Sequence, residues 1–263
     1  MSKVFIGVGH GGSDPGAVAN GFKEKDLNLD IAVSAFNILE RHGVDVKLSR
    51  VGDEDDTLEE EIRECNEYNP TCAIDIHNNA GGGDGVEAFY HYGGGLSKTL
   101  ADNVVSEIVE IGQNCRGTKI KKGDDGRDWY GFIRETACPA VIVECAFVDN
   151  AKDMQIIDTK AEREKMGEAI AKGILATLGL TFYEKVEQRV PDPEPVIEKE
   201  QEPVPEDTPK EEPPVESQET PSEETLPEPT EDKGEDANAK KRSSFVEVII
   251  AVIEFILKLL KGE

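Results

Sequence analysis

A segment rich in glutamate and proline limits which part of this chain can fold. Residues 184–239 hold 20 acidic side chains against 5 basic ones, together with 11 of the 14 prolines of the chain. Aliphatic and aromatic residues are so scarce there that the segment cannot bury a core, and we expect it to be disordered. Of the 263 residues, only about the first 180 are expected to form a packed domain, a length that supports a sizeable core.

The break in composition predicts three parts along the chain. We expect a globular domain at 1–182, a disordered, acidic, proline-rich linker at 183–240, and a C-terminal part at 241–263 that contains a short apolar helix. The linker is expected to act as a tether between the other two parts.

The apolar stretch 245–260 predicts a helix about 24 Å long, which is shorter than the ~30 Å hydrocarbon core of a bilayer. Four charged side chains share one narrow stripe of this helix: Glu247, Glu254, Lys258 and Lys261. A helix that is apolar nearly all round has to bury itself. Contact with a membrane and self-association are comparably consistent with the pattern, and packing on the globular domain is a third possibility.

Charge and cysteine usage restrict the partners and the compartment. The net charge of the chain is −26, and −13 of it belongs to residues 1–183, so we expect no nucleic-acid partner. The cysteines are odd in number and show no C-x-x-C spacing: Cys65, Cys72, Cys115, Cys138 and Cys145. This usage is typical of a reduced compartment and argues against a disulfide framework or a thiolate metal cluster.

Short apolar runs alternate with amphipathic helical patterns along the first 180 or so residues. Strands or extended segments are predicted at 4–9, 44–49, 72–77, 86–92, near 118, at 130–135 and at 140–147. Helices are predicted at 24–42, 57–68, 96–111 and 161–178. The alternation is typical of βαβ units and predicts one α/β domain with a mostly parallel sheet.

Chemically versatile side chains follow several of the predicted strands. The loop GHGGSDPGA after the first strand matches neither common phosphate-binding glycine pattern and has no basic residue, so we infer that it presents His10. His77 closes the run CAIDIH, Glu144 closes AVIVE, and Glu24 opens the first predicted helix. Because the carboxyl ends of parallel strands meet at one edge of the sheet, these four side chains are expected to converge.

Two imidazoles and two carboxylates suit a catalytic zinc site, which needs three protein ligands and a nearby acid or base. Taken alone, His10 and His77 are each equally consistent with a hydrogen-bonded loop histidine, but their shared position favours a metal site. His42 precedes a glycine at a predicted helix end and is interpreted as a capping residue. His91 lies at a strand end and is interpreted as a surface residue.

Four motifs of the chain, GHGGSDPGA, KEKDLNL, DIHNNA and PAVIVECAFVDN, resemble in order and spacing the zinc-dependent N-acetylmuramoyl-L-alanine amidases of the amidase_3 family. This family includes autolysins, sporulation lysins and phage endolysins, and the resemblance covers residues 3–180. It implies a single three-layer domain, with a twisted sheet and helices on both faces. It also implies one zinc ion on His10, Glu24 and His77, with Glu144 as the catalytic carboxylate. Ala146 and Asp149 depart from the family pattern and bear on fine contacts with the substrate.

Roles near the site remain open for several polar residues. Asn78 and Asn150 either orient the substrate or stabilise turns. Arg134 either binds a carboxylate of the peptide stem or forms an ordinary salt bridge. Asp14 either holds the second nitrogen of an imidazole or shapes the turn before Pro15. Cys145 is expected to point into the core, because neighbouring residues of a strand face opposite sides.

The resemblance implies a peptidoglycan hydrolase that cuts the amide between N-acetylmuramic acid and L-alanine. The alternative is a catalytically weak wall-binding or oligomerising module on the same fold. The N-terminal residues show no basic and apolar leader pattern, so we expect synthesis in the cytoplasm. Action on the cell wall would then follow release, in phage lysis or mother-cell lysis.

Overall fold

A six-stranded sheet forms the centre of the computed structural model, which describes residues 2–184. Its strands are β1 (Lys3–Val8), β4 (Asp45–Leu48), β5 (Cys72–Asn79), β6 (Val86–Tyr90), β7 (Cys115–Lys119) and β8 (Ala140–Phe147). They lie side by side in the order β4, β1, β5, β8, β6, β7. A separate two-stranded hairpin consists of β2 (Val18–Ala19) and β3 (Phe22–Lys23).

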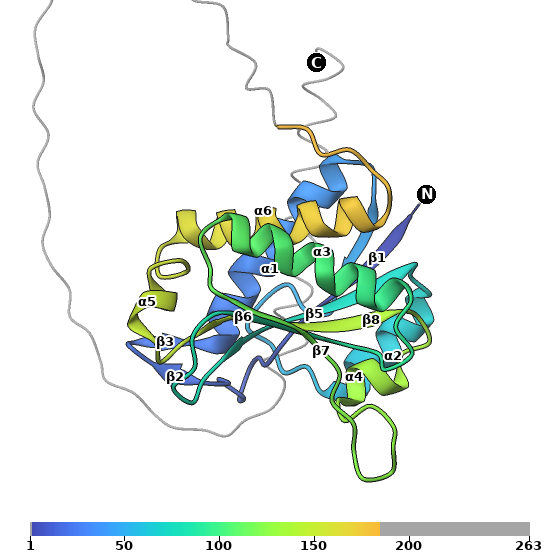
Figure 1. The fold of residues 1–263 in the computed structure, drawn as a ribbon, viewed down its shortest axis with the longest axis horizontal. Coiled ribbons are helices and arrows are strands. Elements are labelled where there is room, and N and C mark those ends of the chain that lie inside the picture. The colour runs from blue at the N-terminus through green and yellow to red at the C-terminus, as the bar shows by residue number, and fades with distance from the viewer. Residues whose placement is uncertain (1, 185–263) are drawn as a thin grey trace, which may run out of the picture. The chain divides into compact units, whose positions relative to one another are not determined.

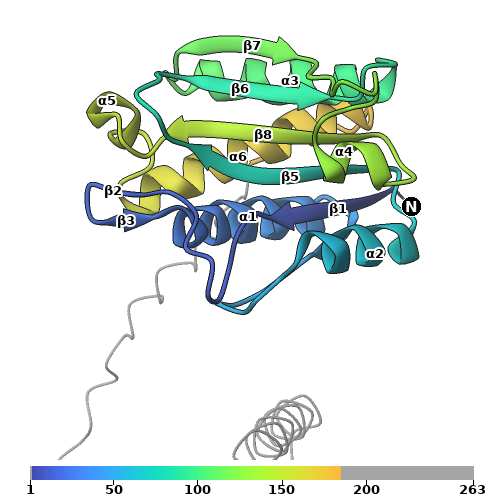
Figure 2. The same ribbon diagram turned by 90° about the horizontal axis from the view of Figure 1, so that it is seen from below.

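The sheet is mostly parallel, as the sequence predicts. β4, β1, β5 and β8 run in the same direction, whereas β6 pairs with β8 in the antiparallel sense and β7 runs parallel to β6. Figure 2 shows the arrowheads of β1 and β8 pointing toward the β2–β3 hairpin, and those of β6 and β7 pointing the other way. The carboxyl ends of β1, β5 and β8 therefore meet at one edge.

Helices cover both faces of the sheet. The long helices α1 (Glu24–Arg41), α3 (Leu96–Glu110) and α6 (Lys160–Thr177) pack on one face, with α6 in contact with both others. The shorter α2 (Leu58–Tyr68) and α4 (Gly131–Glu135) lie on the other face, and α5 (Ala151–Met154) follows β8 (Figure 1). The expected three-layer α/β architecture is thus present.

The alternation of side chains along the strands builds two cores. Val4, Ile6 and Val8 of β1 point into the larger core under α1, α3 and α6, whereas Phe5 points into a smaller one that includes Phe132 of α4. Cys145 belongs to the larger core and is fully buried, as predicted. Since consecutive strand residues face opposite sides, the opposite face of the sheet next to Cys145 is left for Glu144.

Two local features differ from the sequence prediction. The prediction of an extended segment at 130–135 is wrong, because Gly131–Glu135 form the short helix α4. The helix buries the adjacent side chains Phe132 and Ile133, an arrangement that a strand with one buried face does not allow. The β2–β3 hairpin was not predicted, although its Asn20-Gly21 turn, with φ of 53° and 82°, has the residue types that a tight hairpin favours.

The remaining expectations about chain organisation fall beyond the described residues. The linker at 183–240, except its first two residues, and the C-terminal helix at 241–263 lie there, so both stay predictions. Within residues 2–184, no helix combines the length and the apolar character that crossing a membrane requires.

A candidate metal centre at the carboxyl edge of the sheet

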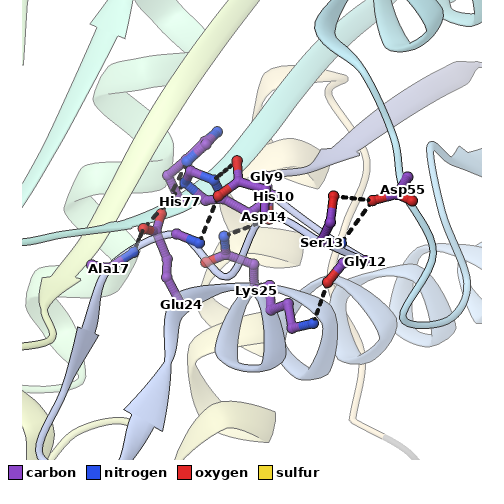
Figure 3. A network of polar contacts seen from close by, with 12 residues as sticks. Gly9, His10, Gly12, Ser13, Asp14, Ala17, Glu24, Lys25, Asp55 and His77 are labelled. Atoms are coloured by element: carbon purple, nitrogen blue, oxygen red, sulfur yellow. Dashed lines mark hydrogen bonds and ion pairs between the residues drawn. The ribbon is translucent and has the colours of Figure 1, made fainter.

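The three predicted metal ligands lie together at the carboxyl edge of the sheet. His10 follows β1, Glu24 is the first residue of α1, and His77 lies near the end of β5. One ligand atom from each residue can be chosen so that all three lie within 4.8 Å of one another. Nε2 of His10 is 3.2 Å from Oε2 of Glu24, and Nδ1 of His77 is 3.1 Å from Oε1. Figure 3 shows these side chains close together beside the start of α1.

The spacing of these atoms fits a small divalent cation. Nitrogen and oxygen ligands at 2.0–2.2 Å from a tetrahedral zinc ion stand about 3.4 Å apart, close to the observed separations. The other ring nitrogens are held by carboxylates: Nδ1 of His10 lies 2.8 Å from Asp14, and Nε2 of His77 lies 3.1 Å from Asp75. Each ring can donate its N–H to that carboxylate and turn its lone pair toward Glu24, an arrangement typical of metal-binding histidines.

The electrostatics of the cluster favour a positive charge between the rings. Burial opposes the charged form of Glu24, but hydrogen bonds from His10 and His77 outweigh it and lower the pKa of this carboxyl. The hydrogen bond to Glu24 raises the pKa of His10. Burial works against protonation of His77, yet the carboxylate of Asp75 outweighs it, and the pKa of this ring is raised well above its usual value. A divalent cation supplies the same positive charge once the ring protons are displaced.

The glycine-rich loop after β1 makes room for the cluster. A Cβ on Gly9 would stand 2.2 Å from the ring of His77, and one on Gly16 would stand 2.6 Å from a carboxylate oxygen of Glu24. His10 itself has a φ of 64°, which is uncommon for a residue with a side chain and is often found at functional sites. The placement of the His10 imidazole therefore requires glycine at two positions of the loop and an uncommon backbone conformation at His10 itself.

Buried polar groups hold the loop backbone and the ligand Glu24 in place through hydrogen bonds. Asn78 donates its backbone N–H to Glu24 and its side-chain N–H to Asn28, which in turn donates to the carbonyl of Gly9. The side chain of Asn78 is almost completely buried, so it supports the ligands and is not available to a substrate. Arg50 donates to the same Gly9 carbonyl and to that of Val8.

Glu144 lies beside His77 on the neighbouring strand. The two residues are register partners in the parallel β5–β8 pair, so their side chains share a face of the sheet. Oε2 of Glu144 is buried and has no hydrogen-bond partner among the residues described. Burial raises the pKa of Glu144 to about 7. A carboxyl group with a pKa near 7, next to the cluster on the neighbouring strand, is suited to accept and return a proton.

The other predicted polar residues have structural partners. Arg134 donates to Glu135 and to the carbonyls of Asp128 and Trp129, so the salt-bridge interpretation holds. Asn150 caps α5 with its side-chain oxygen, which agrees with the turn interpretation. Asp14 has both of the roles considered for it: one oxygen holds Nδ1 of His10, and the other accepts from the N–H of Gly16 in the turn.

The two remaining histidines lie outside the cluster, as predicted. His42 is the C-cap of α1; its Nδ1–H donates to the carbonyl of Ile38 and its Nε2 accepts from the N–H of Tyr183. His91 follows β6, is partly exposed, and its Nε2 lies 3.3 Å from Asp128.

Sequence reasoning missed four supporting residues: Asn28 and Arg50, described above, and also Asp75 and Lys25. Asp75 was not singled out, although its spacing of two from His77 along a strand places both on one face. Lys25 was missed because a lysine next to the start of a helix is usually solvated; here it is buried, and its Nζ donates to the carbonyl of Gly12 and to Asp53. Asp149, one of the departures from the family pattern, accepts from the N–H groups of Gly81 and Gly82.

Comparisons with known proteins agree with this geometry. The model of the Amidase_3 family, described as N-acetylmuramoyl-L-alanine amidase, matches residues 4–176. The chain is 35% identical to the N-acetylmuramoyl-L-alanine amidase CwlM of Bacillus licheniformis over 69% of this chain and 70% of that protein. It is 33% identical to the endolysin of Bacillus phage SPP1 over 68% of each. The catalytic domain of CwlV, an N-acetylmuramoyl-L-alanine amidase from Bacillus (Paenibacillus) polymyxa var. colistinus, superposes with a TM-score of 0.62 at 28% identity, covering 69% of this chain and all (100%) of that domain.

Proposed function

We propose, from the premise that the chain belongs to the Amidase_3 family of N-acetylmuramoyl-L-alanine amidases, that this peptidoglycan hydrolase works with one zinc ion held by His10, Glu24 and His77. Glu144 is its catalytic carboxylate. The observation that carries the assignment is the convergence of three donors from three separate elements, next to a buried carboxylate oxygen without a partner among the described residues.

The residues of the chain divide the work of amide hydrolysis. When bound, zinc supplies Lewis-acid polarisation of the reacting groups. Asp14 and Asp75 orient the two histidines through the ring nitrogens that face away from Glu24. The glycines of the loop from Gly9 to Gly16 keep the backbone close to the cluster and leave room for the side chains of His77 and Glu24.

Glu144 handles the proton in this scheme. It accepts a proton from the attacking water and then donates it to the nitrogen of L-alanine as the amide bond breaks. A pKa near 7 suits both steps, because the carboxyl is then neither a strong acid nor a very weak one at neutral pH. Proton transfer by a positioned side chain typically contributes ~10²–10⁴-fold to the rate.

We propose two further points: first, that the enzyme hydrolyses the peptidoglycan of the cell wall, and second, that it reaches the wall after release by cell lysis. A wall-binding module without activity would not need a complete set of ligands and base, and all four residues are in place here. Similarity to a phage endolysin supports action after release by cell lysis. Cell fractionation tests the second point, since recovery of the protein from the wall of growing, unlysed cells would contradict it.

Replacing the proton carrier tests the first point. We expect Glu144→Gln to lower hydrolysis of purified cell wall by ~10²-fold or more while the zinc content stays the same, because the ligands are untouched. Glu110→Gln, an exposed change on α3, is the matched control and should leave hydrolysis unaltered. Mass spectrometry of the digest should show newly freed L-alanine amino termini. Full activity of Glu144→Gln would contradict the role of Glu144.

A further inference from the structure

Two basic side chains contact one buried carboxylate on the side of β8 that lies away from β5 and His77. Nε of Arg116 lies 3.0 Å from Oε2 of Glu87, and Nζ of Lys119 contacts the same oxygen. Arg116 and Lys119 are three residues apart on β7, and residues three apart in a regular strand point to opposite faces. Some distortion of β7 is therefore needed to bring both cations to one face.

A β-bulge provides that distortion. Val86 pairs with Cys115, whereas the next residue, Glu87, pairs with Gly117, so Arg116 is an extra residue in β7. Gly117 has a φ of 81°, in the left-handed region that glycine adopts readily. Bulges are frequent next to active sites, where they redirect a side chain. Here the bulge turns Arg116 to the face that Lys119 already occupies.

The carboxylate that binds both cations lies next to the proposed catalytic residue. Glu87 and Glu144 are direct register partners in the antiparallel β6–β8 pair, so their side chains share a face. The second oxygen of Glu87 accepts from Nδ2 of Asn79, two residues beyond His77. Because neighbouring strands are about 4.8 Å apart, the β7 backbone lies about 10 Å from that of Glu144.

Two contacts hold the Arg116 side chain, and one edge of its guanidinium has no partner among the described residues. Besides the ion pair with Glu87, the Cζ atom of the guanidinium lies over the ring of Phe147, 4.9 Å from its centroid. Among the described residues, neither of its Nη atoms has a hydrogen-bond or ion-pair partner, and the side chain is partly exposed. Asp84, a neighbouring carboxylate, accepts from Asn114. An arginine positioned in this way presents two parallel N–H donors, the geometry that binds a carboxylate most tightly.

We propose that Arg116, assisted by Lys119, binds a carboxylate of the substrate's peptide stem just beyond L-alanine. This inference rests on the amidase function proposed above. An extended peptide advances about 3.3–3.6 Å per residue, so a carboxylate on the second stem residue falls about 7 Å from the cut amide. A long side chain such as that of Arg116 can reach this position from a strand whose backbone lies about 10 Å from that of Glu144. Arg134, the arginine considered for this task from the sequence, is engaged by Glu135 and two backbone carbonyls instead.

A pair of soluble muramoyl peptides tests the proposal. The two compounds are identical except that the second residue of the stem carries either a free carboxylate or the corresponding carboxamide. With the full-length chain, we expect kcat/KM to be about 10-fold higher for the carboxylate, because a charge-assisted pair to arginine is lost with the amide. Arg116→Ala should remove this preference, mainly through KM, and Arg116→Lys should retain only part of it.

The controls keep the result interpretable. Arg63→Ala removes an exposed arginine of α2 and should keep the full preference. Since the preference compares two substrates on the same variant, partial unfolding of Arg116→Ala cancels. Arg116→Ala with an undiminished preference, or a wild-type chain without one, would overturn the proposal and leave the amidase function intact. Failure of the zinc-loaded wild type to cleave either compound would instead overturn the proposed function, and this inference with it.

Discussion

Two buried carboxylates at the same edge of the sheet are held in the same way but by different partners. Glu24 lies between two imidazoles, His10 and His77. Glu87 lies between a guanidinium and an ammonium group, those of Arg116 and Lys119. Burial opposes ionisation of both carboxyls, and in both the basic partners outweigh it and lower the pKa.

The difference lies in what the partners can give up. An imidazole can give up its proton and then offers a lone pair, so Glu24 with two histidines can exchange protons for a metal ion. Arginine stays protonated and offers only N–H donors. Glu87 therefore remains an ion pair, and its cations keep their positive charge for an anionic group of the substrate.

A third buried carboxyl, Glu61 of α2, forms no ion pair with a basic side chain among residues 2–184. Within the same residues its Oε1 has no hydrogen-bond partner, and neither has Oδ1 of the nearby Asp75. Both oxygens lie within 3 Å of the point where a Cβ on Gly7 would stand, at 2.1 Å and 2.8 Å. Burial, reinforced by the charge of Asp75, raises the pKa of Glu61 well above its usual value. The three carboxyls thus show that the neighbours, and not burial alone, decide the charge.

Of the two substitutions that test this comparison, Asp75→Asn is expected to have the larger effect. If the metal-binding character of the Glu24 site depends on how its histidines are held, removing the charge that orients His77 should weaken zinc affinity about 10–100-fold. Asp14→Asn should have a smaller effect, because Asp14 is 66% exposed whereas Asp75 is 5% exposed. Competitive titration with a chelator measures both. Unchanged affinity in both variants would remove the two carboxylates from the account of the site.

Glu61→Gln tests the third carboxyl and should produce the smaller effect. The folded-state pKa of Glu61 lies above the unfolded value, so the folded state binds more protons and its contribution to the free energy of unfolding falls as the pH rises from about 4.5 to the folded pKa. The steepest loss is about 1.4 kcal/mol per pH unit. Glu61→Gln should remove this slope and be more stable than the wild type at pH 8.

Urea unfolding at several pH values provides the measurement for Glu61. Glu67→Gln, on the exposed face of the same helix, is the control and should keep the wild-type slope. If the wild type and Glu61→Gln showed the same pH dependence of the free energy of unfolding above about pH 4.5, the prediction would be wrong. The carboxyl of Glu61 would then be ionised in the folded chain.

The sequence predicted the main architecture and the residues of the cluster because both depend on strong, local patterns. Apolar runs such as VFIGVG and AVIVECAF indicate buried strands, and polar residues at their ends converge by topology. His10 and His77 were identifiable on that basis. The helix at Gly131–Glu135 was mistaken for an extended segment, because a single helical turn has too few residues to show a period.

The cationic site on β7 was not predictable from the sequence, for a physical reason. Arg116 and Lys119 have a spacing that places them on opposite faces of a regular strand. Only the bulge opposite Glu87, which depends on how β6 and β7 pair, brings them together. Pairing between strands about 30 residues apart leaves no local mark that could reveal such a register shift.

We expect Glu24, the carboxylate with imidazole partners, to hold the metal, and Glu87, the one with permanently charged partners, not to bind it. Zinc bound per chain after dialysis, measured by plasma mass spectrometry on the wild type, Glu24→Gln and Glu87→Gln, tests this directly. We predict about one ion for the wild type and for Glu87→Gln, and nearly none for Glu24→Gln, with all three chains folded by circular dichroism. A folded Glu24→Gln that retains its zinc would contradict the claim.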